Sequence, residues 1–452
     1  MKIKRVAATV LSVVMMCGCL MGAVPIEVQA ASIAGRGVTK TVSGSTATAG
    51  SATSTTVSGN VMNTGSSTGT VRAATSTGTS SAATQSTELR GVWFSYLDWQ
   101  NMPSDEAGFK AAADQVMETI KQNGMNAIFC HVHSHSDAYY SSSLLPTSKF
   151  LAGNGRFDAL QYMVDSAHRH GLRFQAWFNP YRITGYQMKW SDVPTNSIVK
   201  QWYVSGNRNV LLFNGEYYLN PAKPAARELV VNSIREVLTK YDIDGVQFDD
   251  YFYPDLGSSA GSNFDYPEYQ ASGSTLSLSD WRRANVSALI ASVYQTVHQV
   301  RPAAVFGVSP VANLQSLRSE KSYFVDIDTW MKKAGYVDYV LPQIYFDFEQ
   351  KTGSGAASDM AYATCLQSWL QLRQKTGSQV KLYIGLALYK CGTKSWDGNA
   401  TPEWMRRSDI LLREVQLARQ SGQVTGFGIY AYQNFDDAAA QKELANLRTA
   451  FQ

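Results

Sequence analysis

Cysteine is scarce in this sequence, which excludes a fold held together by disulfide bonds. Five cysteines occur in 452 residues, whereas small disulfide scaffolds are rich in them. Cys17 lies in the apolar N-terminal stretch, and Cys130 lies in a later apolar run, where a thiol behaves as a small core residue. Cys365 and Cys391 could pair, but only if their Cα atoms come within disulfide range, which the sequence leaves open.

Charge of one sign and long apolar runs are scarce as well. The formal net charge is +4, and the excess of positive charge lies within residues 1–87, so the rest of the chain is close to neutral. A near-neutral domain gives no reason to expect a nucleic acid partner. Beyond the N-terminal stretch, no run approaches the roughly 18 apolar residues of a membrane span. We therefore expect no integral membrane segment after that stretch.

The first 30 residues have the order of features found in export signals. Basic residues precede an apolar run, Val6–Val24, and small residues up to Ala30 offer a cleavage point. We predict a signal peptide over residues 1–30 and a secreted or cell-surface protein. Cys19 imperfectly matches a bacterial lipoprotein acylation site, so a lipid-anchored form is the alternative.

Residues 31–87 consist largely of Ser, Thr, Gly, Ala and Val and contain no aromatic residue. Such a segment buries too little apolar area to offset the entropy lost on ordering. We expect a flexible, low-complexity linker. A glycosylated stalk or a wall-spanning spacer is the more specific alternative.

From Glu88 onward, eight apolar strand-like runs alternate with helix-like segments. Runs that are apolar on both faces are typical of parallel strands covered by helices. Eight such units predict an α/β fold, a (β/α)8 barrel over residues 88–452. An open doubly wound sheet would require a glycine-rich turn after its first strand, and no glycine directly follows Tyr96. The expected strands are Gly91–Tyr96, Asn126–His133, Leu172–Asn179, Gly245–Asp249, Val305–Pro310, Tyr339–Tyr345, Leu382–Leu388 and Gly426–Tyr432.

The helix-like segments carry end signals. Ser104 is the expected N-cap of the first helix, Gly124 ends it, and Pro302 follows the end of the fourth. The expected helices are Ser104–Asn123, Asp158–His170, Ala222–Lys240, Ser279–Val300, Asp328–Ala334, Met360–Lys375, Pro402–Gln420 and Asp436–Phe451.

Two connections, Thr184–Asn220 and Tyr251–Ser277, are long, and both follow strands. In a barrel they would rise from the face that carries active sites. The first connection is too rich in aromatic rings for disorder, and we expect it to form one wall of a sugar cleft. Its rings are Trp190, Trp202, Tyr203, Phe213, Tyr217 and Tyr218.

The stretch Asp244–Pro254 begins as an apolar strand and ends in two adjacent carboxylates among aromatic rings. Alternate side chains of a strand face opposite sides. Val246 and Phe248 should therefore face the helices, while Gln247 and Asp249 face the barrel axis. Asp250 has the opposite parity, so its direction depends on how the chain turns at the barrel rim.

Two carboxyl groups at a barrel mouth are the groups that glycosidic-bond cleavage uses. Close like charges raise one pKa, which suits a general acid. Asp249 and Asp250 are the first candidates, and Asp137 or Glu349 is the alternative partner for one of them. One of the adjacent aspartates could instead cap a loop. A carboxyl separation of about 5–5.5 Å would indicate retention of configuration, and roughly 6.5–9.5 Å inversion.

Other strands offer polar side chains of the same parity. These are Gln175, Trp177 and Asn179 in the third strand, Gln343 and Tyr345 in the sixth, and His131 and His133 in the second. Gln175 and Gln247 lie deeper in their strands, so we expect them to fill layers of the barrel interior. The others should converge at the mouth as a pocket.

Alternate histidines suggest a metal site at first sight, because His131 and His133 share a face of a regular strand. A barrel metallohydrolase also needs histidines from later strands. His168, His170 and His298 lie on helix-like segments instead. We therefore expect no metal and no cofactor, and we interpret His133 and His135 as contacts to the sugar or to the leaving group.

Several of these motifs resemble the glycosyl hydrolase-like 10 family of secreted or lipid-anchored bacterial barrels, some similar to enzymes that cut peptidoglycan glycan strands. The resemblance covers most of residues 88–452. It implies a site lined by Asp137, Asn179, Tyr181, Arg182, Asp249, Asp250, Gln343 and Tyr345. The sequence departs from the family at His133–Ser136, where Arg-Pro-x-Gly is more common. The motifs are Leu89–Phe94, Asp137–Tyr140 with Leu145 and Pro146, Ala176–Arg182, Asp244–Pro254 and Leu341–Tyr345.

A more distant resemblance connects the fourth strand to family 18 chitinases, which carry Asp-Gly-x-Asp-x-Asp-x-Glu there. Asp244 and Asp249 match that pattern, but Gln247 and Tyr251 replace an aspartate and the acid glutamate. The chitinase mechanism is therefore not transferable.

The sequence as a whole predicts a hydrolase of O-glycosyl bonds that acts on peptidoglycan or a related polysaccharide. Trp93, Trp177, Tyr251 and Tyr253 are the expected ring faces for sugars. The alternatives are a non-catalytic wall-binding barrel and a metal-dependent deacetylase or amidohydrolase. The sequence does not predict an oligomeric state.

Overall fold

The computed structural model describes residues 88–451 except 353–355, 357 and 393–402. The expected export signal, with Cys19, and the expected linker lie outside these residues. Within the described part of the chain, no helix has the length and apolar character that crossing a bilayer requires.

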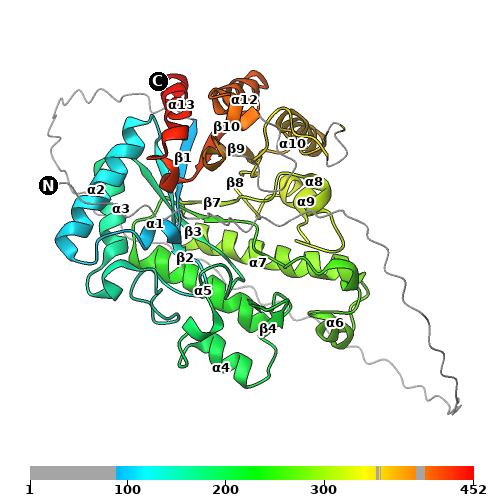
Figure 1. The fold of residues 1–452 in the computed structure, drawn as a ribbon. Helices are drawn as coiled ribbons and strands as arrows, with labels where there is room; N and C mark the ends of the chain where they lie inside the picture. Colours follow the sequence, from blue (N-terminus) through cyan, green and yellow to red (C-terminus); the bar gives the residue numbers. More distant parts are fainter. Residues whose placement is uncertain (1–87, 353–355, 357, 393–402, 452) are drawn as a thin grey trace, which may run out of the picture. The chain divides into compact units, whose positions relative to one another are not determined.

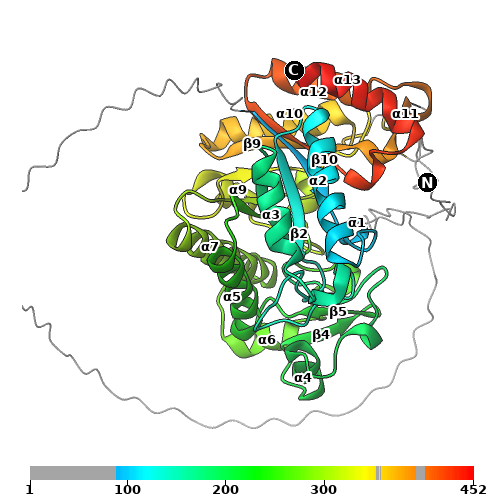
Figure 2. The ribbon, with the colours of Figure 1, turned by 90° about the vertical axis from the view of Figure 1, so that its left-hand side faces the viewer.

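Eight parallel strands close into a barrel surrounded by helices, as Figures 1 and 2 show. The spatial order is β1-β10-β9-β8-β7-β6-β3-β2. The predicted (β/α)8 fold is therefore confirmed, with shifts of a few residues at strand ends. The barrel strands are β1 Leu89–Phe94, β2 Ala127–His133, β3 Arg173–Phe178, β6 Gly245–Phe248, β7 Val305–Val308, β8 Tyr339–Val340, β9 Lys381–Ala387 and β10 Val424–Tyr430.

The expected helices form with altered ends. Asp105 rather than Ser104 caps the first, because its side chain accepts a hydrogen bond from Gly108 N. The segment expected as one helix over Pro402–Gln420 contains two, and the last helix begins at Gln441. The longer helices are α2 Glu106–Gln122, α3 Ala159–Arg169, α5 Pro224–Lys240, α7 Leu278–Val300, α10 Tyr362–Thr376, α12 Ile410–Gln420 and α13 Gln441–Phe451; the short ones are α1 Tyr96–Trp99, α4 Ile198–Val204, α6 Tyr266–Ser272, α8 Leu314–Leu317, α9 Ile327–Lys332 and α11 Glu403–Arg406.

Strand β8 is much shorter than the predicted Tyr339–Tyr345. Pro342 has no N–H to donate to a neighbouring strand, and regular pairing ends before it. Gln343 still forms isolated bridges to Val311 and Gly385. The chain therefore keeps Gln343 at the barrel wall without a continuous strand.

Large side chains fill the barrel interior, and two glutamines are bonded among them. The Tyr339 hydroxyl donates to Gln175 Oε1 at 2.6 Å, and Trp93 Nε1 donates to Gln247 Oε1 at 3.3 Å. A Cβ at Gly307 would lie 2.0 Å from the Tyr339 ring, so only glycine lets that ring cross the neighbouring strand. The prediction that Gln175 and Gln247 are satisfied interior residues is confirmed.

Aspartates that precede two strands fix the opposite, N-terminal end of the barrel. Asp244 Oδ2 accepts hydrogen bonds from Phe174 N at 2.7 Å and His168 Nε2 at 2.9 Å. Asp338 Oδ2 repeats the arrangement with Phe306 N and His298 Nε2. Asp244 therefore begins the reaction-centre motif in sequence but lies about 16 Å of strand away from Asp249.

The two long connections contain structure of their own. The first holds α4 and a hairpin, β4 Val210–Phe213 with β5 Glu216–Leu219, and the second holds α6. These elements lie together at one end of the barrel (Figures 1 and 2). The Phe213 and Tyr218 rings meet Phe264 edge-on. Aromatic contacts therefore join the two connections.

Cys365 in α10 and Cys391 after β9 are both free, buried thiols. The disulfide that the sequence left open does not form in this structure.

Candidate active site

Asp249 lies at the exit of β6 and points toward the barrel axis, as the strand parity predicts. Its side chain is 4% exposed. Trp177 Nε1, from β3, donates to Asp249 Oδ2 at 3.1 Å, and Tyr251 N is 3.3 Å from Oδ1. The carboxyl group is therefore held from the neighbouring strand and from its own turn.

Asp250 turns over the barrel rim toward the segment after β8. The turn is closed by a hydrogen bond from Phe252 N to Asp250 O at 2.9 Å. The Gln343 side chain hydrogen-bonds the Asp250 carboxylate and also donates to Ser309 O at 2.9 Å. The rim turn thus directs Asp250 to the mouth, where Asp249 also lies.

Burial and mutual repulsion shift the ionisation of this pair. Burial, then the Asp250 charge, raise the pKa of Asp249 well above its usual range, although Arg182 opposes the shift. Burial raises the pKa of Asp250 to about 6, against hydrogen bonds that include that from Gln343. The two carboxyl groups therefore titrate as a coupled pair, and the environment favours the neutral form of each relative to a free aspartate.

Arg182 supplies positive charge to the mouth from the segment after β3. Its side chain is 8% exposed, and Nε donates to Ser134 O at 3.2 Å. The guanidinium carbon lies 4.3 Å from the Tyr251 ring centre and 5.8 Å from that of Tyr96. The Tyr251 face beneath the guanidinium is thus occupied by a cation.

The loop after β2 is organised by Ser134 and Asp137. Asp137 Oδ1 accepts hydrogen bonds from Ser134 N at 3.0 Å and His135 N at 2.8 Å. Asn179 Nδ2 donates to Ser134 O at 3.1 Å. Asp137 is buried, and its position is that of a loop-capping acceptor.

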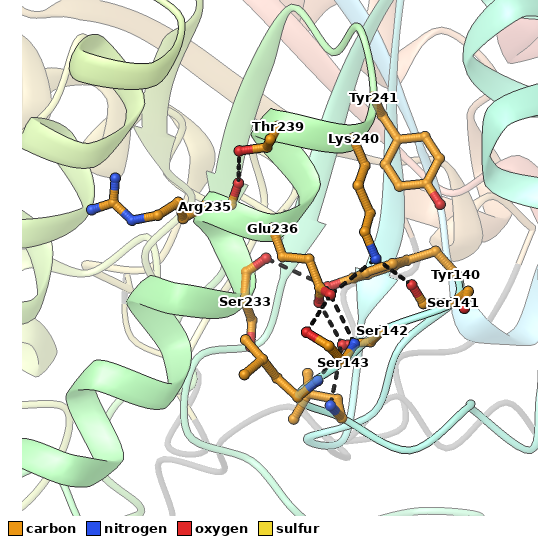
Figure 3. A network of polar contacts seen from close by, with 12 residues as sticks. Tyr140, Ser141, Ser142, Ser143, Ser233, Arg235, Glu236, Thr239, Lys240 and Tyr241 are labelled. Atoms are coloured by element: carbon orange, nitrogen blue, oxygen red, sulfur yellow. Dashed lines mark hydrogen bonds and ion pairs between the residues drawn. The ribbon is translucent and has the colours of Figure 1, made fainter.

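Glu236 of α5 anchors the next part of the same loop (Figure 3). Its carboxylate accepts the Tyr140 hydroxyl at 3.1 Å, the Ser142 hydroxyl at 2.5 Å and Ser143 N at 2.8 Å. Lys240 Nζ lies 3.0 Å from Glu236 Oε1. The loop that carries Asp137 is therefore fastened to the outer helical layer.

A bulge in β2 overturns the expectation that His131 and His133 share a face. The register with β3 shifts between them, so that His131 pairs with Trp177 and His133 with Phe178. The His133 ring accordingly stacks on Phe178 at 5.6 Å, on the outward side. The extra residue of a bulge rotates the side chain that follows it.

His135 is also buried, between the rings of Tyr96 and Phe150, and its Nδ1 lies 2.9 Å from Ser134 Oγ. Burial lowers the pKa of His133 to about 4 and that of His135 well below its usual value. Within the part of the chain that the structure describes, no three His, Cys, Asp or Glu side chains are placed to share a metal ion.

Of four further predicted contacts, three are buried and the fourth, Glu349, lies on the surface in an ion pair. Trp93 is 2% exposed and belongs to the interior cluster of the barrel. The Tyr253 hydroxyl donates to buried Asp265 at 2.7 Å, Tyr181 is fully buried, and Glu349 pairs with Arg406 at 2.7 Å on the surface. The expectation of open ring faces at Trp93 and Tyr253 is wrong, because interior packing encloses both rings.

The expected aromatic wall is largely packed against itself. Trp190 stacks on Tyr217, with 3.8 Å between ring centres and 8° between planes, and Tyr203 meets Tyr217 edge-on. Lys200 Nζ lies 4.3 Å from the Trp190 ring centre. A role of this connection in sugar binding stays a prediction, but these stacked faces are closed.

Tyr96 and Tyr430 near the site escaped the sequence analysis, and His131 was expected only as one of the polar strand residues that face the mouth. The Tyr345 ring, which was predicted, lies 5.8 Å from Tyr430. Each of the three stands at or just after the C-terminal end of a barrel strand. Their position near strand ends could have identified them from the sequence, because the C-terminal ends of barrel strands face the mouth.

A parallel barrel whose mouth holds a buried carboxyl group coupled to a partly buried one, together with a cation, is the arrangement of a glycoside-cleaving enzyme. Comparison with known proteins agrees. The model of the family "Glycosyl hydrolase-like 10" matches residues 88–406. The chain belongs to this family and is a glycoside hydrolase.

Two curated relatives are similar over most of the chain. Glycosyl hydrolase DigH of Escherichia coli (strain K12) is 28% identical over 398 residues, covering 80% of this chain and 87% of its own. Glycosyl hydrolase YngK of Bacillus subtilis (strain 168) is 31% identical over 369 residues, covering 76% and 68%.

Solved structures share the fold. The PgaB (BpsB) glycoside hydrolase domain from Bordetella bronchiseptica superimposes with a TM-score of 0.55 at 14% identity, covering 80% of this chain and 99% of that one. An endo-1,4-beta-mannanase from Rhizomucor miehei gives 0.51 at 11% identity, covering 80% and 94%.

Proposed function

We propose that this glycoside hydrolase cleaves O-glycosidic bonds of peptidoglycan or a related polysaccharide outside the cytoplasmic membrane. The observation that carries the proposal is the coupled pair Asp249 and Asp250 at the barrel mouth. The signal-like residues 1–30 and the linker-like residues 31–87 support export. A lipid-anchored form through Cys19 would place the same domain at the cell surface.

The two carboxyl groups take different roles because their environments differ. Burial and the Asp250 charge favour the neutral form of Asp249, which donates its proton to the glycosidic oxygen as that bond breaks. Asp250 ionises above about pH 6 and faces the sugar as base or nucleophile. A retaining enzyme would use it as nucleophile, and an inverting enzyme would use it to activate water.

The surrounding residues position this pair and the sugar. Arg182 balances the charge of the ionised carboxylate, and Gln343 orients Asp250. Asn179, His135 and Tyr345 are buried, and we propose that they support the loops and rings around the mouth. Asp137 holds the loop backbone through Oδ1, so we propose a structural role for it rather than the catalytic role that the sequence suggested.

The test uses purified protein with peptidoglycan glycan strands freed of peptides, and with intact sacculi, and reads the products by mass spectrometry. The wild type should release glycan fragments, and Asp249→Asn and Asp250→Asn should not. Asp242→Asn is the matched control, because Asp242 is 76% exposed and pairs with Arg301.

Other outcomes separate the alternatives. Binding to sacculi with no turnover by the wild type would favour a wall-binding barrel and refute the proposal. Release of acetate, or loss of activity with a chelator, would favour the metal-dependent deacetylase. Cleavage that Asp249→Asn and Asp250→Asn leave intact would move the reaction centre elsewhere.

A further inference from the structure

The His131 side chain, one layer behind the aspartate pair, is fixed from two directions. Tyr96 N donates to His131 Nδ1 at 3.0 Å. The imidazole also stacks on the Trp177 indole, with 3.3 Å between ring centres and 15° between planes. The same indole donates its N–H to Asp249 Oδ2. A continuous contact therefore runs from the backbone of α1 through two rings to the carboxyl group.

The hydrogen bond from Tyr96 fixes the form of the imidazole. Because Nδ1 accepts, the neutral ring carries its proton on Nε2. Burial and the nearby Arg182 charge lower the pKa of His131 well below its usual value. The ring therefore stays uncharged and adds no positive charge beside Asp249.

Stability alone does not account for a histidine here. Nε2 of His131 is buried and makes no well-formed hydrogen bond among the described residues, although the Asn179 side chain lies near enough to act on the ring, and a poorly paired buried donor is unfavourable. The benefit of the ring lies in its other two contacts, with Tyr96 and Trp177. Both contacts fix the orientation of the imidazole ring, which a side chain that only filled the same space would not do.

We propose that His131 is a positioning residue of this enzyme, which holds the Trp177 indole so that its N–H stays on Asp249. The inference rests on the proposed function, because it concerns the ionisation of the proposed acid. Without the stack, one face of the indole loses its support, the ring shifts within its site, and the hydrogen bond from Trp177 to Asp249 is weakened or lost. That hydrogen bond favours the ionised carboxylate, so its loss raises the pKa of Asp249 by roughly 0.5–1 pH unit.

The chain supplies a matched control two residues away. His133 lies on the same strand, is equally buried, and faces Phe178 across the bulge instead of Trp177. His131→Asn removes the ring but keeps a short polar side chain, and His133→Asn makes the same change on the other side of β2.

The first experiment follows the indole N–H resonance of Trp177 by NMR in the full chain, identified through Trp177→Phe. In the wild type this resonance should shift as the aspartate pair titrates. His131→Asn should abolish that shift and speed exchange of the indole proton at least tenfold, whereas His133→Asn should change neither. An unchanged Trp177 resonance in a folded His131→Asn protein overturns the proposal.

The second experiment measures the pH dependence of kcat. His131→Asn and Trp177→Phe should both move the alkaline limb upward by roughly 0.5–1 pH unit with little change in KM. Trp177→Phe keeps a stacked ring and loses only the N–H, so it provides this readout even where His131→Asn folds poorly. An unmoved limb in Trp177→Phe also overturns the proposal. The NMR result does not depend on turnover, so failure of the proposed function and failure of this inference are distinguishable.

Discussion

Replacing Glu236 by glutamine tests whether the loop beside the site is held by charge. Glu236 is 9% exposed in its side chain and receives hydrogen bonds from Tyr140, Ser142 and Ser143 (Figure 3). Burial would raise the pKa of Glu236, but hydrogen bonds from Ser142, Ser143 and Lys240 outweigh it and lower the pKa from 4.5 to about 2. Glutamine keeps the shape of the side chain and loses the charge.

The shift in pKa sets the size of the effect. A depression of roughly 2.5 units corresponds to about 3 kcal/mol of stability at neutral pH. The Lys240 side chain is 41% exposed, and solvent screens its share. We therefore expect Glu236→Gln to lower the free energy of unfolding by about 2 kcal/mol.

The sign of the pH dependence follows from a folded-state pKa below the unfolded one. The stabilisation by Glu236 is fully present above about pH 4.5 and is lost as the pH falls toward about 2. Urea unfolding from about pH 6 to pH 3 should show the gap between wild type and Glu236→Gln narrowing with acid.

The matched control is Glu118→Gln, on the exposed surface of α2, where the side chain is 43% exposed. Its effect should stay within about 0.5 kcal/mol. The reasoning would be refuted if Glu236→Gln lowered the free energy of unfolding by no more than this control, or by an amount that did not change with pH.

Three further predictions concern the site and its supports. Asp249→Asn and Asp250→Asn should each lower kcat by about 100- to 10,000-fold. The wild-type kcat should rise with pH through about 6 as Asp250 ionises. A pH profile of kcat that is flat through that region would contradict the role of Asp250. Arg282→Ala should cost about 3–5 kcal/mol in urea unfolding, because it leaves buried Asp265 without its 2.7 Å partner; a loss below about 1 kcal/mol would show the pair to be dispensable. Ser136→Gly should raise the melting temperature, because Ser136 holds φ at +53°, which costs a non-glycine residue about 1 kcal/mol; a lowered melting temperature would show that its hydroxyl outweighs the strain.

The repeating pattern of the fold could be predicted from local sequence. Apolar runs with no polar face, such as Ala127–His133, require helices on both sides of the sheet. Strand parity also placed Asp249 toward the axis, because the strand is regular from Gly245 to Phe248. Where a strand is regular, the side to which each side chain points follows from its position along the strand.

The parity argument failed where the strand is irregular. The bulge in β2 turned His133 toward Phe178 and left His131 beside Trp177. A bulge depends on the register with the adjacent strand, which the residues of β2 alone do not specify. The sequence analysis therefore placed His131 correctly on the inner face of β2 and His133 wrongly.

The sequence by itself determined the alternating elements, the family and the location of the aspartate pair at a strand exit. These follow from periodicity and from short motifs, which are properties of neighbouring residues. The tertiary structure alone decided which rings are open, where Asp250 turns, and that Asp137 caps a loop while Asp244 lies at the far end of the barrel. Such outcomes depend on burial and hydrogen bonding between segments distant in sequence, since pKa values and exposed faces belong to the packed environment.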